Sequence, residues 1–175
     1  MLRLRICKKI DRCSERLMNV GIGEFAVSKS PNILATWSLG SCLAIILYEE
    51  RTKIGGLAHA MLPKATSRRG KVKGMFVDEA IACMLNEIRR CGSPDKGITA
   101  AIVGGATIFN FLGDLAVGDR NIKMAREIFR KFGIPLIEEV GGNRGRNVLL
   151  DLEKGEVLVE ITRSPIILAD LKIEK

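Results

Sequence analysis

One cysteine and the only histidine of the chain stand close together in the stretch TWSLGSCLAIILYEERTKIGGLAHAMLP, residues 36–63. A cysteine thiol becomes an effective nucleophile when a neighbouring base or cation lowers its pKa. Cys42 begins one apolar run, and His59 lies in the next run along the chain. The residue types therefore suit a thiol nucleophile with an imidazole base, if the fold brings the two together.

The link between the two runs predicts how they meet. The apolar run CLAIILYEE, residues 42–50, predicts a largely buried strand. The run KIGGLAHAML, residues 53–62, resumes the strand pattern, with Leu57 and His59 on one face. The short ERTK link between them predicts a hairpin, which lays the two strands side by side. Cys42 and His59 would then meet near one end of the pair.

Three neighbours of this pair could complete a site. Gly40 permits a close backbone approach, and the amides around Ser41 and Cys42 could donate hydrogen bonds to an oxyanion. Thr36, at the end of the preceding strand, could orient the imidazole of His59. However, a free cysteine is often a buried core residue, and a lone histidine on an apolar face is often one as well. From the spacing alone, the structural and the catalytic interpretations both stay open.

The rest of the chain predicts a single mixed α/β domain. One helix is predicted from Val77 to Ile88 and ends before Gly92 and Pro94, and a second runs from Asp119, as its N-cap, to Phe132 before Gly133. Further strands are predicted at residues 23–28, 32–38, 97–106, 135–142, 147–152 and 156–162.

Composition restricts the function further. The chain has 175 residues, of which 47% are hydrophobic and 27% charged, as in an ordinary globular domain. Its five cysteines form no CxxC pair, and an odd number fits a disulfide framework poorly, so we expect a reducing cytoplasm. With a single histidine, no structural zinc site is expected. Cys91 is predicted to lie in the core, on the apolar stripe of the first helix, with Cys83 at its edge.

The net charge of +8 indicates an acidic partner. Aromatic residues make up only 5% of the chain, which argues against nucleic acid. No apolar run reaches the roughly 20 residues that span a bilayer, so no membrane insertion is expected. The positive charge gathers in residues 1–20 and in a loop after Pro63. This loop could steer an acidic substrate, although a solvated tail and a solvated loop are the simpler interpretation. The loop cluster comprises Arg68, Arg69, Lys71 and Lys73.

Several motifs in order resemble the CheD family of chemoreceptor glutamine deamidases. The stretch GIGEFAVSKSPNILATWSLGSCLAIILYEERTKIGGLAHAMLP is similar to the start of this family, and the likeness covers roughly residues 21–160. The Gly-Ser-Cys element, the GG-x-x-H-x-M-L-P element and a late Gly-Gly-Asn-x-Gly-Arg element are quite specific. The likeness to the family continues through the stretches VDEAI, VGGATIF, GDRN and FGIPLIEEVGGNRGRNVLLDLEKGEVLV.

The resemblance implies a fold and a site. The fold is an α/β sandwich with two packed β-sheets and flanking helices, similar to deamidating toxin cysteine hydrolases. The family's nucleophile, base and orienting threonine fall on Cys42, His59 and Thr36, with Gly40 and Ser41 at the oxyanion, and no metal or other cofactor is implied. Trp37-Ser38 departs from the smaller residues usual there, which bears only on local loop shape. We expect residues 21–163 to form the catalytic domain, residues 1–20 a basic extension, and residues 164–175 a tail.

The implied activity is hydrolysis of glutamine side chains to glutamate in the cytoplasmic helices of chemoreceptors, with release of ammonia. A CheC-type phosphatase is a further partner that the family implies. One alternative is a binding module that acts mainly through the complex with such a phosphatase. Another is transglutamination or peptide cleavage, because these reactions share the thioester step and the sequence does not separate them.

Overall fold

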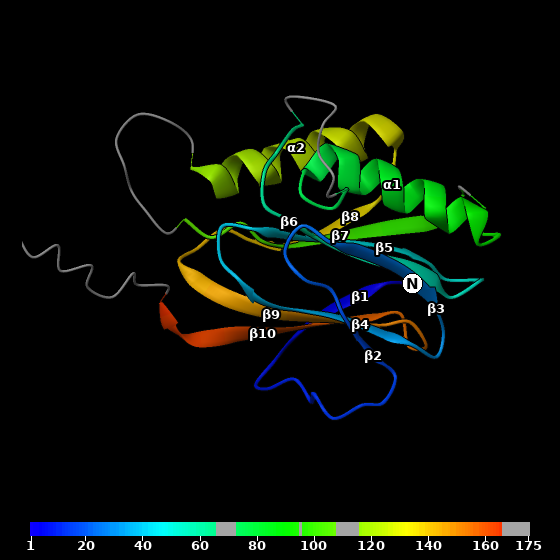
Figure 1. Ribbon diagram of the computed structural model, residues 1–175, viewed down its shortest axis with the longest axis horizontal. Coiled ribbons are helices and arrows are strands. Elements are labelled where there is room, and N and C mark those ends of the chain that lie inside the picture. Colours follow the sequence, from blue (N-terminus) through cyan, green and yellow to red (C-terminus); the bar gives the residue numbers. More distant parts are fainter. Residues whose placement is uncertain (66–72, 95, 108–115, 166–175) are drawn as a thin grey trace, which may run out of the picture.

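The structure is a computed structural model that describes residues 1–65, 73–94, 96–107 and 116–165. Two five-stranded sheets pack face to face, and two helices cover the outer face of the second sheet (Figure 1). The predicted mixed α/β sandwich is confirmed. The likeness to deamidating toxins stays a prediction.

The first sheet combines strands from both ends of the chain. Its order is β1-β10-β9-β4-β2, with β1 parallel to β10 and β2 parallel to β4. Strand β9 runs antiparallel to both of its neighbours. The bounds are β1 (Arg3–Cys7), β2 (Leu17–Asn19), β4 (Ile33–Leu39), β9 (Arg144–Asp151) and β10 (Glu156–Pro165).

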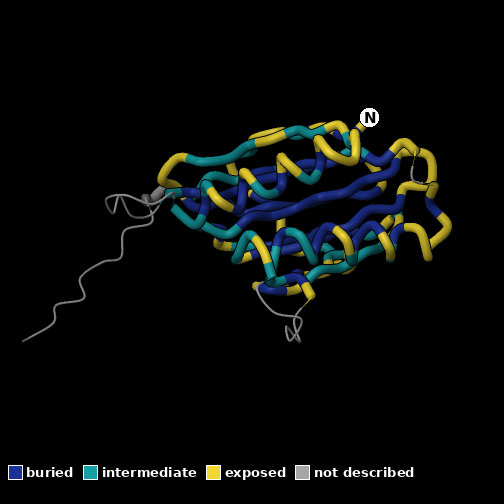
Figure 2. Tube along the Cα trace, turned by 90° about the horizontal axis from the view of Figure 1, so that it is seen from above, coloured by how far each residue is buried: buried dark blue, intermediate teal, exposed yellow. Residues whose placement is uncertain are grey.

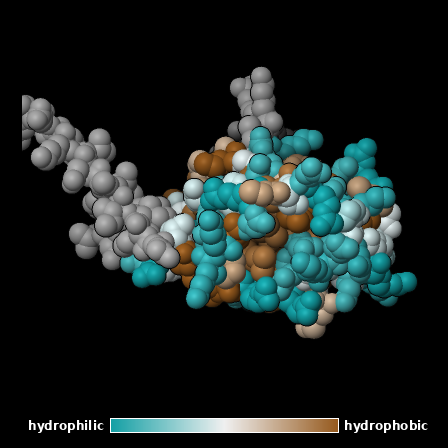
Figure 3. Space-filling model, turned by 90° about the horizontal axis from the view of Figure 1, so that it is seen from below, coloured by the Kyte–Doolittle hydropathy of each residue, from teal (hydrophilic) through white to brown (hydrophobic). Residues whose placement is uncertain are grey.

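The N-terminal segment is part of this sheet, so the prediction of a solvated tail for residues 1–20 is wrong. Both β1 and β2 lie within it, and Leu2 and Ile10 are buried. Ile10 packs on the outer face of the first sheet, against Ile33 and Leu149. Figure 3 shows the molecule from this side, where hydrophobic side chains appear between hydrophilic ones. The basic residues around these apolar positions concealed the strand pattern.

At the C-terminal end, β10 continues to Pro165, and residues 166–175 lie outside the described part.

The second sheet holds the predicted hairpin. Its order is β3-β6-β5-β7-β8, and β5 pairs antiparallel with β6 from Leu43 opposite Ala60 to Glu49 opposite Ile54. This confirms the hairpin around residues 50–53. The bounds are β3 (Phe25–Lys29), β5 (Leu43–Glu49), β6 (Ile54–Ala60), β7 (Ile98–Gly104) and β8 (Leu136–Val140).

The two helices are α1 (Val77–Arg90) and α2 (Val117–Phe132). Helix α2 begins two residues before the predicted Asp119, after Ala116, and no side chain caps its N-terminus. Its predicted end is confirmed, because Gly133 adopts the left-handed conformation with φ 64°. Cys91 lies just beyond the last residue of α1 and is exposed, so its predicted core position is wrong. Cys83 is half-buried.

Apolar side chains fill two layers, one between the sheets and one between the second sheet and the helices. On β6 the two faces alternate, so that Leu57 packs between the sheets and Ala58 packs toward the helices. Every residue of β5 and β6 is buried. Figure 2 shows buried residues along the central strands and exposed ones on the turns and outer helix faces. A polar side chain on the Leu57 face of β6 is therefore enclosed between two sheets.

Candidate active site

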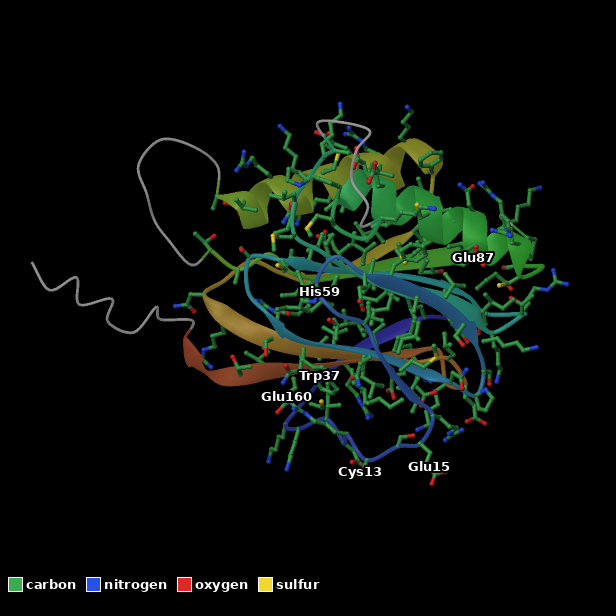
Figure 4. The ribbon with its side chains drawn as sticks, in the orientation of Figure 1. Cys13, Glu15, Trp37, His59, Glu87 and Glu160 are labelled. Carbon is green, nitrogen blue, oxygen red and sulfur yellow. The ribbon has the colours of Figure 1, made fainter. Side chains whose placement is uncertain are left out.

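His59 lies between the two sheets, on the same face of β6 as Leu57 (Figure 4). Its side chain is 1% exposed, and its Nδ1 lies 2.7 Å from Oγ1 of Thr36 on β4 of the opposite sheet. The Thr36 hydroxyl donates its single proton to the carbonyl oxygen of Val20, 2.8 Å away. Thr36 can therefore only accept from His59, which places the imidazole proton on Nδ1. The lone pair is left on Nε2.

Nε2 of His59 is buried and has no hydrogen-bond partner. Burial lowers the pKa of His59 below its ordinary value of 6.5, because the charged imidazolium loses solvation. The ring is therefore neutral at pH 7. A buried, neutral imidazole with a free lone pair can accept a proton from a neighbouring group.

Cys42 immediately precedes β5 and packs, half-buried, against the apolar layer between the sheets. Ala44 is directly opposite His59 in the β5–β6 ladder. Cys42 lies two residues before Ala44 and packs against the layer between the sheets, so it lies on the face of the hairpin that carries His59. Burial raises the pKa of the Cys42 thiol above its ordinary value of 9.0. At rest the two side chains are a neutral thiol and a neutral imidazole.

The backbone leading to Cys42 is held by the segment that follows β7. The Gly105 N–H donates to the carbonyl of Cys42 at 2.8 Å, and the Ala106 N–H donates to the carbonyl of Gly40 at 2.9 Å. A Cβ on Gly104 would lie 2.5 Å from the Cys42 carbonyl oxygen, so this contact requires glycine. Gly40 and Ser41 are both half-buried beside Cys42. Their predicted contribution to an oxyanion site stays a prediction.

Two asparagines that the sequence analysis missed also hold this backbone. Oδ1 of Asn147, on β9, accepts a hydrogen bond from the Ser38 N–H at 2.9 Å. Asn121, on α2, donates to the Ser41 carbonyl at 3.2 Å. Both asparagines are buried, and Asn121 interrupts the otherwise apolar buried stripe of α2. That interruption is the sequence signal by which Asn121 could have been found.

Trp37, the larger of the two residues expected to depart from the family pattern, lies on the outer face of the first sheet, opposite the face that carries Thr36. Trp37 is half-buried on the outer face, away from His59 (Figure 4). Its Nε1–H donates to Oδ1 of Asn19 at 2.7 Å, and the Arg12 guanidinium lies 4.2 Å from the ring centroid. Ser38 has a positive φ of 57°, which is uncommon for a residue other than glycine.

The segment that surrounds the predicted basic loop begins and ends beside the His59 strand. The Met61 N–H donates to the carbonyl of Met75 at 2.9 Å. A Cβ on Gly74 would lie 2.4 Å from the backbone of Glu24, whose carbonyl accepts from the His59 N–H. Lys73 is exposed. The remaining basic residues of the predicted cluster, Arg68, Arg69 and Lys71, lie outside the described residues.

No group of three or more His, Cys, Asp or Glu side chains in the described part of the chain could hold a metal ion. Neither described helix is long and apolar enough to cross a membrane.

A mixed α/β sandwich with a thiol and an imidazole on one face of paired strands defines a candidate thiol hydrolase. Residues 61–161 match the family model described as CheD chemotactic sensory transduction. A probable chemoreceptor glutamine deamidase CheD of Desulforamulus reducens is 41% identical over 154 residues, which cover 85% of this chain and 93% of that protein. The chain belongs to the CheD family.

Other relatives bear related names. A probable chemoreceptor glutamine deamidase CheD of Pyrococcus abyssi is 40% identical over 147 residues, 81% of this chain and 90% of that protein. The chemoreceptor glutamine deamidase CheD of Thermotoga maritima is 37% identical over 141 residues, 80% of this chain and 88% of that protein. These names describe protein-glutamine glutaminases. Among solved structures, hypothetical protein YfiH of Bacillus licheniformis matches 66% of this chain and 50% of its own, with TM-score 0.44 and 17% identity.

Proposed function

We propose that this protein is a protein-glutamine glutaminase that converts glutamine side chains of chemoreceptors to glutamate, with Cys42 as the nucleophile. One observation carries the proposal. The hydrogen bond between Thr36 and Nδ1 of His59 leaves the Nε2 lone pair free in an enclosed position, on the face that Cys42 shares. The names of the 37–41% identical relatives point to the same reaction.

In the first half of the reaction, His59 moves one proton from the thiol to the leaving nitrogen. Nε2 of His59 takes the thiol proton while the Cys42 sulfur attacks the carboxamide carbon of the glutamine. Backbone amides around Ser41 and Cys42 hold the developing oxyanion. The imidazolium then gives its proton to the leaving nitrogen, ammonia departs, and a thioester remains. Water, deprotonated by His59, attacks the thioester and releases glutamate and the thiol.

Burial decides when the proton moves. It raises the pKa of Cys42 and lowers the pKa of His59, so both side chains stay neutral before substrate binds. A preformed thiolate–imidazolium pair is therefore disfavoured. Proton transfer accompanies the attack, and Thr36 stabilises the imidazolium that forms by keeping Nδ1–H bonded.

The surface beside His59 suits an amphipathic helix. Ile22 is 57% exposed and Met61 is 37% exposed, and both lie near His59, whose carbonyl accepts from the Gly23 N–H at 2.8 Å. Exposed apolar side chains next to a candidate site can contact the apolar side of a docked helix. We therefore propose the cytoplasmic helices of chemoreceptors as substrates, and the cytoplasm as the place of action.

Mass spectrometry of a chemoreceptor cytoplasmic fragment, incubated with the protein, tests the proposed reaction. Deamidation adds about one mass unit at each modified glutamine, and one ammonia is released per unit added. Cleavage would shorten the fragment, and transglutamination would join it to another molecule. A fragment that keeps its mass through prolonged incubation would contradict the proposal.

A CheC-type phosphatase remains a predicted partner. If it covers the same site, it should slow deamidation of the receptor fragment in proportion to the complex formed. If the complex itself were the main function, the protein without the phosphatase would modify the fragment only at a negligible rate.

A further inference from the structure

A buried asparagine of α2 connects the backbone beside the candidate nucleophile with the backbone beside the candidate base. Asn121 is 0% exposed, and its Nδ2 donates to the carbonyl of Ser41 at 3.2 Å and to the carbonyl of Met61 at 3.0 Å. Ser41 directly precedes Cys42, and Met61 follows His59 by two residues. Each hydrogen of the amide group is directed to one side of the site.

These two bonds replace the interstrand hydrogen bonds that the sheet lacks at this point. Pairing between β5 and β6 ends at Leu43 opposite Ala60. Beyond that point, Asn121 bonds the carbonyls of Ser41 and Met61, which lie just outside β5 and β6, and so fixes their separation. Because both partners are carbonyls, which only accept, the orientation of the amide is defined by its contacts.

Close backbone packing holds α2 where Asn121 can reach both carbonyls. A Cβ on Gly118 would lie 2.5 Å from the carbonyl oxygen of Gly105, in the segment whose amide bonds the Cys42 carbonyl. The first turns of α2 therefore rest directly on the backbone that supports Cys42. A displacement of this helix would be transmitted to the candidate site.

The remaining atom of the Asn121 amide sets it apart from a residue that serves packing alone. Among the described residues, only two buried side-chain polar atoms lack a hydrogen-bond partner, and they are Nε2 of His59 and Oδ1 of Asn121. Buried polar groups are normally satisfied, and an exception calls for an explanation such as strain or a catalytic role. Both exceptions in the described part lie at this one site.

We infer that Asn121 is a positioning residue that sets the distance and angle between Cys42 and His59 through the Ser41 and Met61 carbonyls. The inference rests on the proposed roles of Cys42 and His59. A buried side chain does not touch the substrate, so its loss should lower kcat and leave KM unchanged. Misplacement of reacting groups by about 1 Å can cost about 100-fold in rate.

The test compares Asn121→Ala with Phe129→Leu, a buried substitution two turns further along α2 that bonds nothing at the site. We expect Asn121→Ala to lower kcat about 100-fold, and Phe129→Leu to keep the parent kcat while losing stability. Iodoacetamide labelling of Cys42, followed by peptide mass spectrometry, measures thiol reactivity without the receptor. Cys42 labelling should fall relative to Cys83 in Asn121→Ala only.

Asn121→Asp provides a second test that a purely structural role would not pass. Its carboxylate would face two carbonyl oxygens and donate nothing, whereas the protonated acid donates one hydrogen bond. The ratio of variant to parent kcat should therefore rise as pH falls, and titration of His59 cancels in that ratio. This variant also decides the matter if Asn121→Ala does not fold, because the protonated side chain has the shape of the parent amide.

Parental kcat and Cys42 labelling in Asn121→Ala, or losses equal to those of Phe129→Leu, would overturn the inference. So would a ratio for Asn121→Asp that does not change with pH. Activity in Cys42→Ala would instead overturn the proposed mechanism, so the two failures can be told apart.

Discussion

The two ends of the β5–β6 hairpin hold buried polar side chains of opposite kinds. At the turn, Glu49 is 1% exposed and accepts hydrogen bonds from the Arg51 N–H at 3.1 Å, the Thr52 N–H at 2.8 Å and the Thr52 hydroxyl at 2.6 Å. At the other end, His59 is equally buried, yet its Nε2 has no partner. One hairpin thus carries a satisfied polar group and an unsatisfied one.

The difference shows which buried polar groups serve the fold and which are available for chemistry. Burial opposes the ionisation of Glu49, but the hydrogen bonds from Thr52 and Arg51 outweigh it and hold the pKa of this carboxyl below its ordinary value. The single hydrogen bond of His59, from Nδ1 to Thr36, does not offset its burial, so its pKa falls and Nε2 stays an unprotonated acceptor. Substitutions at the two ends should accordingly separate stability from activity.

After loss of the nucleophile itself, the largest effect is expected from His59→Ala. The chain has no second histidine that could replace the base. Loss of general acid–base catalysis typically lowers the rate by about 10²–10⁴-fold. Single-turnover deamidation of the receptor fragment, monitored by mass, measures this loss. Activity within a few-fold of the parent would show that Nε2 is not the base.

The plot of kcat/KM against pH should decline at acid pH and at alkaline pH, and both declines should lie further from neutrality than the ordinary pKa values of histidine and cysteine would place them. Activity requires neutral His59 together with the thiol proton that it later delivers to ammonia. Because burial lowers the pKa of His59, activity should decline only below its ordinary value of 6.5 as pH falls. Because burial raises the pKa of Cys42, the alkaline decline should come only above 9.0.

On each declining limb, kcat/KM should change about tenfold per pH unit, since one proton is gained or lost. The measurement is kcat/KM on the receptor fragment across the range in which circular dichroism shows the fold intact. A profile without limbs from acid to alkaline pH would count against the proposed pair.

Thr36→Ala should have a smaller effect, because orientation of the imidazole is worth less than the imidazole itself. A net hydrogen bond contributes about 1 kcal/mol, which corresponds to roughly a five- to tenfold loss of kcat. Thr36→Ser keeps the hydroxyl that joins His59 to the Val20 carbonyl and should retain more activity. Equal losses in both variants would point to packing of the methyl group instead.

Glu49→Gln should leave kcat of the folded protein unchanged and lower stability. Replacing an ionised acceptor that is buried with several donors costs about 1–3 kcal/mol in free energy of unfolding. The pKa of Glu49 is lowered in the folded state, so its stabilisation is present above its ordinary value of 4.5 and is lost as pH falls through the folded pKa. Urea titrations at pH 7 and at lower pH should show the difference between parent and variant diminishing with acid. A lower kcat in this variant would contradict the assignment of the turn end to stability alone.

Local patterns in the sequence predicted the hairpin and the face that His59 shares with Leu57, because strand alternation and a short turn act over few residues. They could not predict β1, whose partner β10 comes from the other end of the chain. Cys91 was misplaced because helical periodicity stops at Arg90, one residue before it.

The candidate site divides in the same way. Cys42, His59 and Thr36 were identified from residue type, order and family resemblance. The Val20 carbonyl that fixes the Thr36 proton is a backbone group, which no residue type reveals. Asn121 bonds residues 60 and 80 positions away, so only the packing of α2 on the second sheet brings it to the site.

Deamidation by Cys42→Ala tests the central claim most directly. Cys42 lies just outside β5 and is half-buried, so its loss should leave the fold intact, as circular dichroism and unfolding can verify. We predict that the folded Cys42→Ala protein adds no mass to a chemoreceptor fragment that the parent deamidates, and that Cys42→Ser is equally inactive. Glutamine-to-glutamate conversion by Cys42→Ala at a rate near that of the parent would contradict the account.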